Sequence, residues 1–465
     1  MSENQEQKPR KVFLSCLGTT NYVKVPYSAL NEAERAIIEQ SEQTAFIQVA
    51  RLRALEARSE RPETVIILTT EEARSRNVLR AAPTNYDPLP KDTYDGLDVE
   101  LDALQYESAK SLTHIPEGAS LTELWQIFNV VLAQTKEGDE LYLDITHGFR
   151  SLSAILILAL SFALKARKAK LKEVSYGAWE VIKPASNRDA RPTFDLTPFF
   201  VLTEWTDAVH VFRVSRDLRP LADVFGREAT NIKRRAHKNA PVSFGNAAKA
   251  LDELAKSMVL CDIPRLPDRA RKALSGLRGA QADLLRPEFF ELAPARYLLD
   301  DIILHIEPLT GGQKTDWQLA RAGFAAAEWS FSGFAYQAAF TFLRESMPLV
   351  MSLHLRSTKA LPECTNTEGD AVLNCIIASL NPNTSPRFAD ARVEAGYNKL
   401  MQQNDLKHVT AFATYADRVA KARNALNHAG MGKEPVSTKT LERIHADMKT
   451  VLFPAILKII GVDLR

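Results

Sequence analysis

The sequence predicts a doubly wound, Rossmann-like α/β domain at the N-terminus, followed by an all-α region. Up to about Trp205, short apolar segments alternate with longer helical segments, which is the order of a mostly parallel sheet covered by helices on both faces. The apolar segments are continuous, as is typical of strands buried on both sides. After Trp205, helical patterns dominate to the end of the chain.

The predicted strands of the α/β domain are short, and most are followed by a helix. The first covers Val12–Leu17 and ends at Gly18. Residues 82–97 contain three prolines and a glycine, so we expect a loop there. The other predicted strands cover residues 65–68, 111–115, 140–145 and 174–181, and the predicted helices cover residues 43–57, 71–79, 121–135 and 149–168.

The helical half is divided by two polar segments, 356–370 and 381–387, which we expect to be loops. Its predicted helices cover residues 221–240, 247–261, 269–285, 317–347, 393–403, 407–428 and 438–452. We therefore expect three parts. These are an α/β domain (1–206), a helical connecting region (207–316) and a C-terminal helical domain (317–465).

Composition limits the classes of function. A chain of 465 residues with a net charge of +2 is not a polycation, so any contact with nucleic acid must come from local patches. The four cysteines are far apart and form no metal-ligand spacing, so we expect neither a metal site nor a disulfide framework. The first residues are polar rather than signal-like, and the apolar run 152–164 is too short to cross a bilayer. These features predict a cytoplasmic protein without membrane contact.

Two segments follow predicted strands at the edge where doubly wound sheets bind ligands. The first offers a glycine turn, hydroxyls and an amide, and the second offers a histidine, a glycine and an arginine suited to phosphate. Either segment alone could be only a turn or a helix cap. The residues are Gly18, Thr19, Thr20, Asn21 and Tyr22 in the first segment, and Asp144, Thr146, His147, Gly148, Phe149, Arg150 and Ser151 in the second. No G-x-G-x-x-G follows the first strand and no P-loop motif is present, which disfavours NAD-dependent and P-loop chemistry.

The sharpest motif of the helical half is R-N-x-x-x-H, formed by Arg423, Asn424 and His428. Asn424 and His428 are i, i+4 neighbours on one helix face, and Arg423 can border the same cleft. Histidine transfers protons near neutral pH, and arginine stabilises the charge that develops on phosphorus during RNA cleavage. The motif therefore predicts metal-independent RNA cleavage. One copy supplies one histidine, so we expect a composite site in a homodimer.

Plainer interpretations stay open for each feature. Arg423 and His428 could be an exposed arginine and a histidine favoured by the helix dipole. Glu345 could pair with Arg423, although a solvated charge is the simpler expectation. The basic cluster Lys233–Lys238 could hold RNA phosphates but is more typical of a solvated helix face. The aromatic stripe of Phe324, Trp329, Phe331, Phe334, Phe340 and Phe342 is more typical of a core than of a base-stacking platform.

Together these residues resemble the CRISPR-associated CARF–HEPN ribonucleases of type III systems. The resemblance rests on Phe13–Asn21 (FLSCLGTTN), residues 44–46 (TAF), Leu141–Ser151 (LYLDITHGFRS) and Arg423–His428 (RNALNH). It covers nearly the whole chain, but the stretch from Trp205 to about Asp316 matches no motif of the family. The role of that stretch stays open.

The resemblance implies a CARF sensor that dimerises and binds one cyclic oligoadenylate across the two-fold axis. Gly18–Tyr22, Thr44 and Asp144–Ser151 would line its pocket. It implies a HEPN nuclease that uses Arg423, Asn424 and His428 to cut single-stranded RNA without metal, leaving a 2′,3′-cyclic phosphate and a 5′-hydroxyl. The implied activator is cyclic tetra-adenylate, with cyclic hexa-adenylate as the alternative, and the implied assembly is a homodimer or a higher oligomer.

Two other classes of function compete with this interpretation. A ligand-sensing regulator without nuclease activity would contact DNA or a partner through its helical half, yet no helix-turn-helix or winged segment is recognisable. A nucleotide-dependent oxidoreductase is disfavoured by the missing glycine fingerprint.

Overall fold

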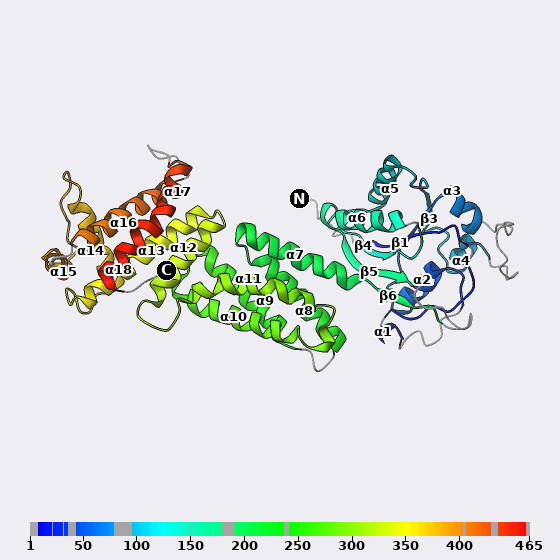
Figure 1. The fold of residues 1–465 in the computed structure, drawn as a ribbon, viewed down its shortest axis with the longest axis horizontal. Coiled ribbons are helices and arrows are strands. Elements are labelled where there is room, and N and C mark those ends of the chain that lie inside the picture. The colour runs from blue at the N-terminus through cyan, green and yellow to red at the C-terminus, as the bar shows by residue number, and fades with distance from the viewer. Residues whose placement is uncertain are drawn as a thin grey trace. The chain divides into compact units, whose positions relative to one another are not determined.

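The structure is a computed structural model that describes residues 8–20, 22–30, 32–35, 43–78, 95–148, 150–178, 190–236, 241–402, 406–428 and 436–461. The chain divides into two compact units, Met1–Phe200 and Val201–Arg465 (Figure 1). The division falls within helix α7 (Thr197–Ser215), close to the point where the sequence pattern changes. Each unit is described by itself below.

The first unit is built on a six-stranded sheet in the order β3-β2-β1-β4-β5-β6. Its strands are β1 (Lys11–Cys16), β2 (Thr64–Thr69), β3 (Lys110–His114), β4 (Glu140–Asp144), β5 (Lys170–Gly177) and β6 (Thr193–Asp195). The first five pair in parallel, and β6 pairs antiparallel with β5. The prediction of a mostly parallel, Rossmann-like sheet followed by helices is confirmed.

Helices cover both faces of this sheet because alternate residues of each buried strand point to opposite sides. In β1, Val12 and Leu14 join the core formed with α5 (Leu121–Gln134) and α6 (Arg150–Ala166). Phe13 joins the core on the other face, which is covered by α2 (Ile47–Ala57), α3 (Glu71–Ala73) and α4 (Leu97–Ala103) (Figure 1). Both faces being buried explains why the strands are continuously apolar.

A buried ionic cluster joins α2 to the sheet. The Arg51 guanidinium, 2 % exposed, contacts Glu34 at 2.5 Å and Glu173 of β5 at 2.8 Å. Arg58 also reaches both carboxylates, at 3.3 and 2.6 Å. Burial would raise the pKa of Glu34, but the hydrogen bond and charge of Arg51 lower that pKa below its usual value. The Glu34 carboxylate is therefore held ionised inside the protein.

Arg51→Met is expected to lower the free energy of unfolding by about 3 kcal/mol, because it removes the guanidinium that contacts two buried carboxylates. Urea denaturation of the variant measures this loss. Lys168→Met removes the exposed Lys168–Glu137 pair and should leave the denaturation midpoint almost unchanged. Equal effects of the two substitutions would contradict a structural role for the buried cluster.

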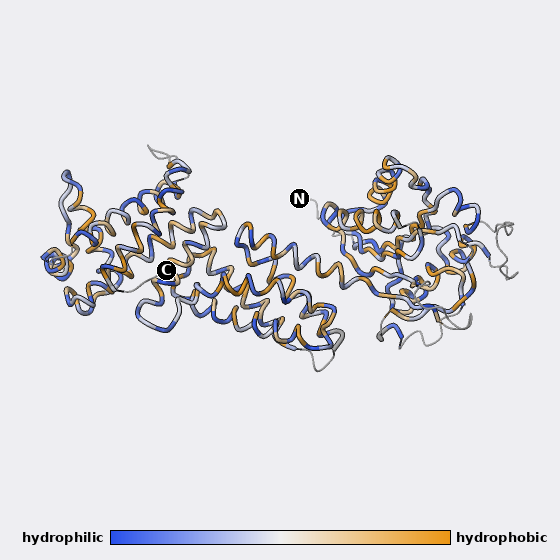
Figure 2. The backbone as a smooth tube through the Cα atoms, viewed as in Figure 1, coloured by the Kyte–Doolittle hydropathy of each residue, from blue (hydrophilic) through white to orange (hydrophobic). Residues whose placement is uncertain are grey.

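The second unit is helical and shares one hydrophobic core from Trp205 to Ile456. Hydrophobic and hydrophilic residues are interspersed along most of its helices (Figure 2), which allows these helices to bury one side and expose the other. After α7, its α-helices are α8 (Arg219–Ala236), α9 (Ser243–Val259), α10 (Leu266–Asp283), α11 (Arg296–Ile306), α12 (Gln318–Ser332), α13 (Tyr336–Ser357), α14 (Asn366–Ser379), α15 (Ala391–Met401), α16 (Leu406–Asn427), α17 (Thr438–Asp447) and α18 (Phe453–Ile460). Residues on both sides of the predicted boundary at residue 316 belong to this core, so that boundary stays a prediction.

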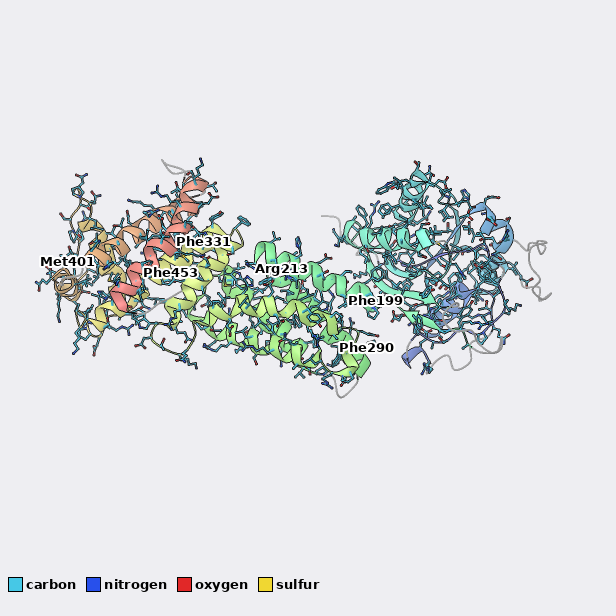
Figure 3. The ribbon with its side chains drawn as sticks, viewed as in Figure 1. Phe199, Arg213, Phe290, Phe331, Met401 and Phe453 are labelled. Carbon is cyan, nitrogen blue, oxygen red and sulfur yellow. The ribbon has the colours of Figure 1, made fainter. Side chains whose placement is uncertain are left out.

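The aromatic stripe packs mainly in the core, as expected. Phe324, Trp329, Phe331, Phe340 and Phe342 are buried. Phe331 on α12 and Phe453 on α18 are labelled in Figure 3. The sixth member, Phe334, is 71 % exposed because it lies in the turn between two helices.

That turn corrects the prediction of one helix over residues 317–347. The segment forms two helices, α12 and α13, and the second continues to Ser357. Phe334 has the left-handed φ of 60° that ends a helix. A Cβ at Gly333 would lie 2.4 Å from the Ser215 carbonyl oxygen, so the chain turns where it packs closely against the end of α7.

Other boundaries also differ from the predictions. The helix predicted over residues 43–57 begins at Ile47, because Thr44 instead forms a β-bridge with Val25. Helix α14 begins inside the predicted loop 356–370, where Thr365 and Glu368 form a capping box. The sequence patterns did not predict α1 (Glu32–Arg35), α4, β6, α11 or α18. Residues 79–94 and 179–189, which hold most of the predicted loop 82–97 and the end of the strand 174–181, lie outside the described residues.

Candidate functional site

The sheet order places a candidate ligand-binding edge at the carboxyl ends of β1 and β4. These strands are neighbours, but the chain leaves β1 toward α2 on one face and leaves β4 toward α6 on the other. Doubly wound sheets generally bind ligands beside such a reversal. The loops are the predicted segments that begin at Gly18 and follow Asp144, so the topology brings the two segments together.

Two side chains that follow β2 in the sequence hold the loop after β1. Asn77 donates its side-chain amide to the carbonyl oxygens of Gly18, at 2.8 Å, and Thr20, at 3.0 Å. Arg76 donates to the Thr19 carbonyl oxygen at 3.0 Å. The Gly18 amide donates to the Tyr22 hydroxyl at 2.9 Å. The loop carbonyls are therefore occupied, and the exposed Thr20 faces solvent.

Asp144 organises the loop after β4 from inside the protein. It is fully buried and accepts hydrogen bonds from the hydroxyl groups of Ser15, at 2.6 Å, and Thr146. Burial raises the pKa of Asp144, while these two hydrogen bonds lower it in part. The Thr146 hydroxyl accepts from the Gly177 amide at 2.7 Å. Asp144 therefore fixes the position of Thr146 rather than offering its own surface to a ligand.

His147 is the point where the two loops meet. Its ring lies edge-on to Tyr22, with ring centroids 4.7 Å apart. A Cβ placed on Gly18 would lie 3.5 Å from the His147 Cβ. Within the part of the chain that the structure describes, the buried Nε2 of His147 has no hydrogen-bond partner. A ligand with a hydrogen-bonding group at this edge would satisfy that nitrogen.

The remaining predicted ligand residues divide into three groups. Gly148 adopts φ 121°, where a side chain would be strained, and Ser151 is exposed at the start of α6. Thr44 is buried, and its hydroxyl donates to Glu100 at 2.7 Å. Asn21, Phe149 and the side chain of Arg150 lie outside the described residues.

Burial makes His147 a weak base. It lowers the pKa of this imidazole to about 4, so the ring is neutral at physiological pH. Because the folded pKa is below the unfolded value near 6.5, its contribution to stability is full above pH 6.5 and is lost as the pH falls toward 4. We expect wild type to lose stability relative to His147→Gln across this window. Thermal unfolding of both proteins at pH 7.5, 6, 5 and 4.5 tests this, and a constant difference would contradict it.

The R-N-x-x-x-H motif lies at the C-terminal end of α16. Arg423 is half-buried, whereas Asn424 and His428 are exposed. The His428 amide donates to the Asn424 carbonyl oxygen at 3.1 Å, so helical geometry extends to the histidine. The structure therefore places Asn424 and His428 on one exposed face, as their spacing predicts.

Helix α13 supports this end of α16. Gln337 donates its side-chain amide to Asn427 Oδ1 at 3.0 Å. The pKa of the Cys261 thiol is raised to about 11, mainly by burial and in part by the charge of Glu345, while the charge of Arg423 opposes the rise, so both charges lie near that thiol. Among the described residues, however, Arg423 forms no ion pair with Glu345, and its buried Nε has no hydrogen-bond partner. The guanidinium therefore has unused donors beside the exposed face.

Sequence reasoning missed the supporting residues Asn77, Ser15, Gly177 and Gln337. Asn77 could have been identified from the sequence, because it follows β2 at the same edge of the sheet as Gly18. The other three are brought in by pairing and packing that no local pattern encodes. Of the basic cluster Lys233–Lys238, the structure describes only the Lys233 side chain, which is exposed.

The described residues contain no group of three or more histidine, cysteine, aspartate or glutamate side chains that could hold a metal ion. None of their helices is both long enough and apolar enough to cross a membrane.

The sequence matches part of a CRISPR-associated protein. The chain is 29 % identical over 147 residues to CRISPR-associated protein MJ1674 of Methanocaldococcus jannaschii. The match covers 31 % of this chain and 23 % of that protein, so the chain spans about a quarter of the length of its curated relative. No family model matches the sequence. This weak homology supports a relation to CRISPR-associated proteins.

Proposed function

We propose that this protein is a metal-independent endoribonuclease of type III CRISPR antiviral defence, and that a cyclic oligoadenylate activates it. The observation that carries the proposal is the exposed R-N-x-x-x-H face of α16, in a chain whose Rossmann-like unit has a ligand edge at its topological switch. The weak homology to a CRISPR-associated protein supports the biological setting.

The first unit would act as the sensor. Its edge between β1 and β4 offers the Thr20 hydroxyl, the free Nε2 of His147 and the aromatic ring of Tyr22. Nucleotides are recognised by such hydrogen-bonding groups together with aromatic contacts. Cyclic tetra-adenylate is the proposed activator, and cyclic hexa-adenylate is the alternative. The ligand would act by binding one arrangement of a homodimer more tightly than another.

The second unit would cut single-stranded RNA. The 2′-oxygen attacks the adjacent phosphorus as its proton passes to a base, and the P–O5′ bond breaks as the 5′-oxygen gains a proton. His428 would transfer one of these protons, since histidine titrates near neutral pH. The unused donors of Arg423 would stabilise the negative charge on the pentavalent phosphorus, and Asn424 would donate to a phosphate oxygen. The products would be a 2′,3′-cyclic phosphate and a 5′-hydroxyl.

Two proton transfers are easier with two histidines than with one. A two-fold axis beside the C-terminal end of α16 would bring together the same exposed face from both protomers. A homodimer, or a higher oligomer built from it, would therefore complete the site.

The proposal is tested with labelled single-stranded RNA and full-length protein in EDTA. Cyclic tri-, tetra- and hexa-adenylate are added separately, and the RNA ends are analysed. We expect cleavage only with the tetramer or the hexamer, and ends that carry a 2′,3′-cyclic phosphate. Binding of a cyclic oligoadenylate without any cleavage would instead favour a ligand-sensing regulator.

A further inference from the structure

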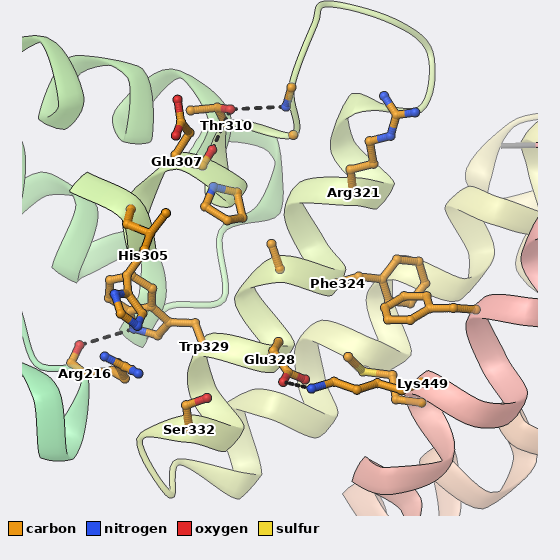
Figure 4. A pocket seen from close by; sticks show the side chains of 17 residues that line it. Arg216, His305, Glu307, Thr310, Arg321, Phe324, Glu328, Trp329, Ser332 and Lys449 are labelled. Atoms are coloured by element: carbon orange, nitrogen blue, oxygen red, sulfur yellow. Dashed lines mark hydrogen bonds and ion pairs between the residues drawn. The ribbon is translucent and has the colours of Figure 1, made fainter. Parts of the chain in front are cut away.

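A cavity of about 980 Å³ lies within the helical unit, and none of the R-N-x-x-x-H residues is among the residues that line it. It is bordered by the ends of α7 and α11, by the turn η6 (Glu307–Thr310), by α12 and by the segment around Lys449 (Figure 4). Its volume is near the upper end of the range of roughly 300–1,000 Å³ that is typical of small-molecule sites. Its lining comes both from residues 205–316, which match no family motif, and from the helices that follow them.

Aromatic side chains form much of its wall. Trp329, Phe324 and Phe453 line the cavity, and the last two pack edge-to-face with centroids 5.7 Å apart. The Trp329 indole is fixed, because its Nε1 donates to the Arg216 carbonyl oxygen at 3.2 Å. A rigid apolar wall of this kind suits a flat ring.

Arg216 supplies a positive charge that the protein leaves largely uncompensated. Its guanidinium lies 5.3 Å from the Phe212 ring, and its buried Nε has no hydrogen-bond partner within the described residues. The carboxylate of Asp301 acts on this cation, but it is already engaged by Arg213 at 2.7 Å and by His305 at 3.3 Å. Burial lowers the pKa of Arg216, which reflects the loss of water around this cation.

The acidic residues of the cavity, in contrast, already have cationic partners. Glu328 contacts Lys449 at 2.8 Å and His445 at 2.9 Å, and Glu307 contacts Arg278 at 3.2 Å. Arg321 brings a second guanidinium to the lining (Figure 4). The net charge of the lining is therefore positive, and an anion would be attracted to the side that holds Arg216.

We infer that this cavity binds a nucleoside phosphate, with the phosphate at Arg216 and the base against the aromatic wall. Arginine donors suit phosphate oxygens, and aromatic rings suit bases. The nucleoside phosphate is either a free mononucleotide or the 5′-phosphorylated end of an RNA chain. This inference does not depend on nuclease activity or on the sensor edge.

Binding of radiolabelled adenosine 5′-monophosphate to the full-length protein is measured by equilibrium dialysis, with adenosine, inorganic phosphate and a 5′-phosphorylated RNA tetramer as competitors. We expect saturable binding that neither adenosine nor phosphate alone displaces effectively. Competition by the tetramer at lower concentration than unlabelled mononucleotide would identify an RNA end as the ligand. The opposite order would identify a free nucleotide.

Arg216→Gln should weaken this binding about tenfold or more, the size expected for a lost hydrogen bond to a charged group. Arg216→Lys should retain part of the affinity. Ala325→Phe, which fills the cavity from α12, should weaken binding without removing a charge. Arg219→Gln is the matched control, because Arg219 is exposed and pairs with Asp217 outside the cavity.

Melting temperatures establish that each variant is folded. The inference is overturned if wild type shows no saturable binding, or if adenosine competes as well as its monophosphate. It is also overturned if folded Arg216→Gln and Ala325→Phe both bind like wild type, since a nucleotide held at the sensor edge would be unaffected by them. None of these outcomes depends on RNA cleavage.

Discussion

His428→Ala is expected to lower the rate of activator-dependent RNA cleavage by about 10²–10⁴-fold, the usual contribution of a general acid or base. The imidazole is exposed at the C-terminal end of α16. The substitution should therefore leave folding and activator binding unchanged. A rate loss at constant stability is the signature of a chemical role rather than a structural one.

The measurement is a single-turnover cleavage rate at saturating cyclic tetra-adenylate or, if that ring is inactive, cyclic hexa-adenylate. Lys421→Ala is the matched control, because Lys421 is exposed on the same helix and pairs with the nearby Asp417. We expect the control to cleave at nearly the wild-type rate. If His428→Ala cleaves as fast as the control, the motif is not the nuclease site, and the interpretation as an exposed histidine at a helix end is correct.

The spacing of the motif predicted the geometry of this face because a helix repeats every 3.6 residues. It could not predict what surrounds the face. Gln337 and Cys261 reach the end of α16 through tertiary packing, and both are distant in sequence. The lack of an ion pair between Arg423 and Glu345 is likewise a result of packing. Because this pair is not formed, Arg423 keeps hydrogen-bond donors available for a phosphate.

The sheet was predictable for a similar local reason. Strands buried on both faces leave continuous apolar runs, and the runs in β1, β2 and β4 were found at nearly the observed bounds. The three-residue strand β6 is too short to leave such a run. The break between α12 and α13 was missed because it depends on Gly333 packing against Ser215, a contact between distant segments. Local patterns thus locate the elements, whereas long-range contacts set their ends.

The same distinction applies to the ligand edge. The segments after β1 and β4 were predicted from the general behaviour of doubly wound sheets, and the observed strand order makes them neighbours. The different roles of Asp144 and His147 were not predictable. Asp144 and His147 lie in one short segment, yet the carboxylate is inside the protein and the imidazole is at the meeting point of both loops.

The second large effect, a weaker response to the activator, is expected for Gly18→Val at this edge. A Cβ at residue 18 would lie 2.9 Å from the Tyr22 hydroxyl oxygen, which now accepts from the Gly18 amide. The valine methyl groups would displace Tyr22 and crowd His147, so both loops lose their present positions. We expect the concentration of cyclic oligoadenylate needed for half-maximal cleavage to rise on the order of 100-fold, as an overpacked site would require.

The cleavage rate at saturating activator should approach that of wild type, because the R-N-x-x-x-H residues belong to the other unit. Gly226→Ala is the control, since a Cβ there meets only Ala248, at an ordinary distance of 3.9 Å. A folded Gly18→Val protein with an unchanged activation curve would place the activator elsewhere. A variant that is fully active without activator would mean that the substitution mimics the ligand-bound state, and it would contradict the predicted loss of affinity.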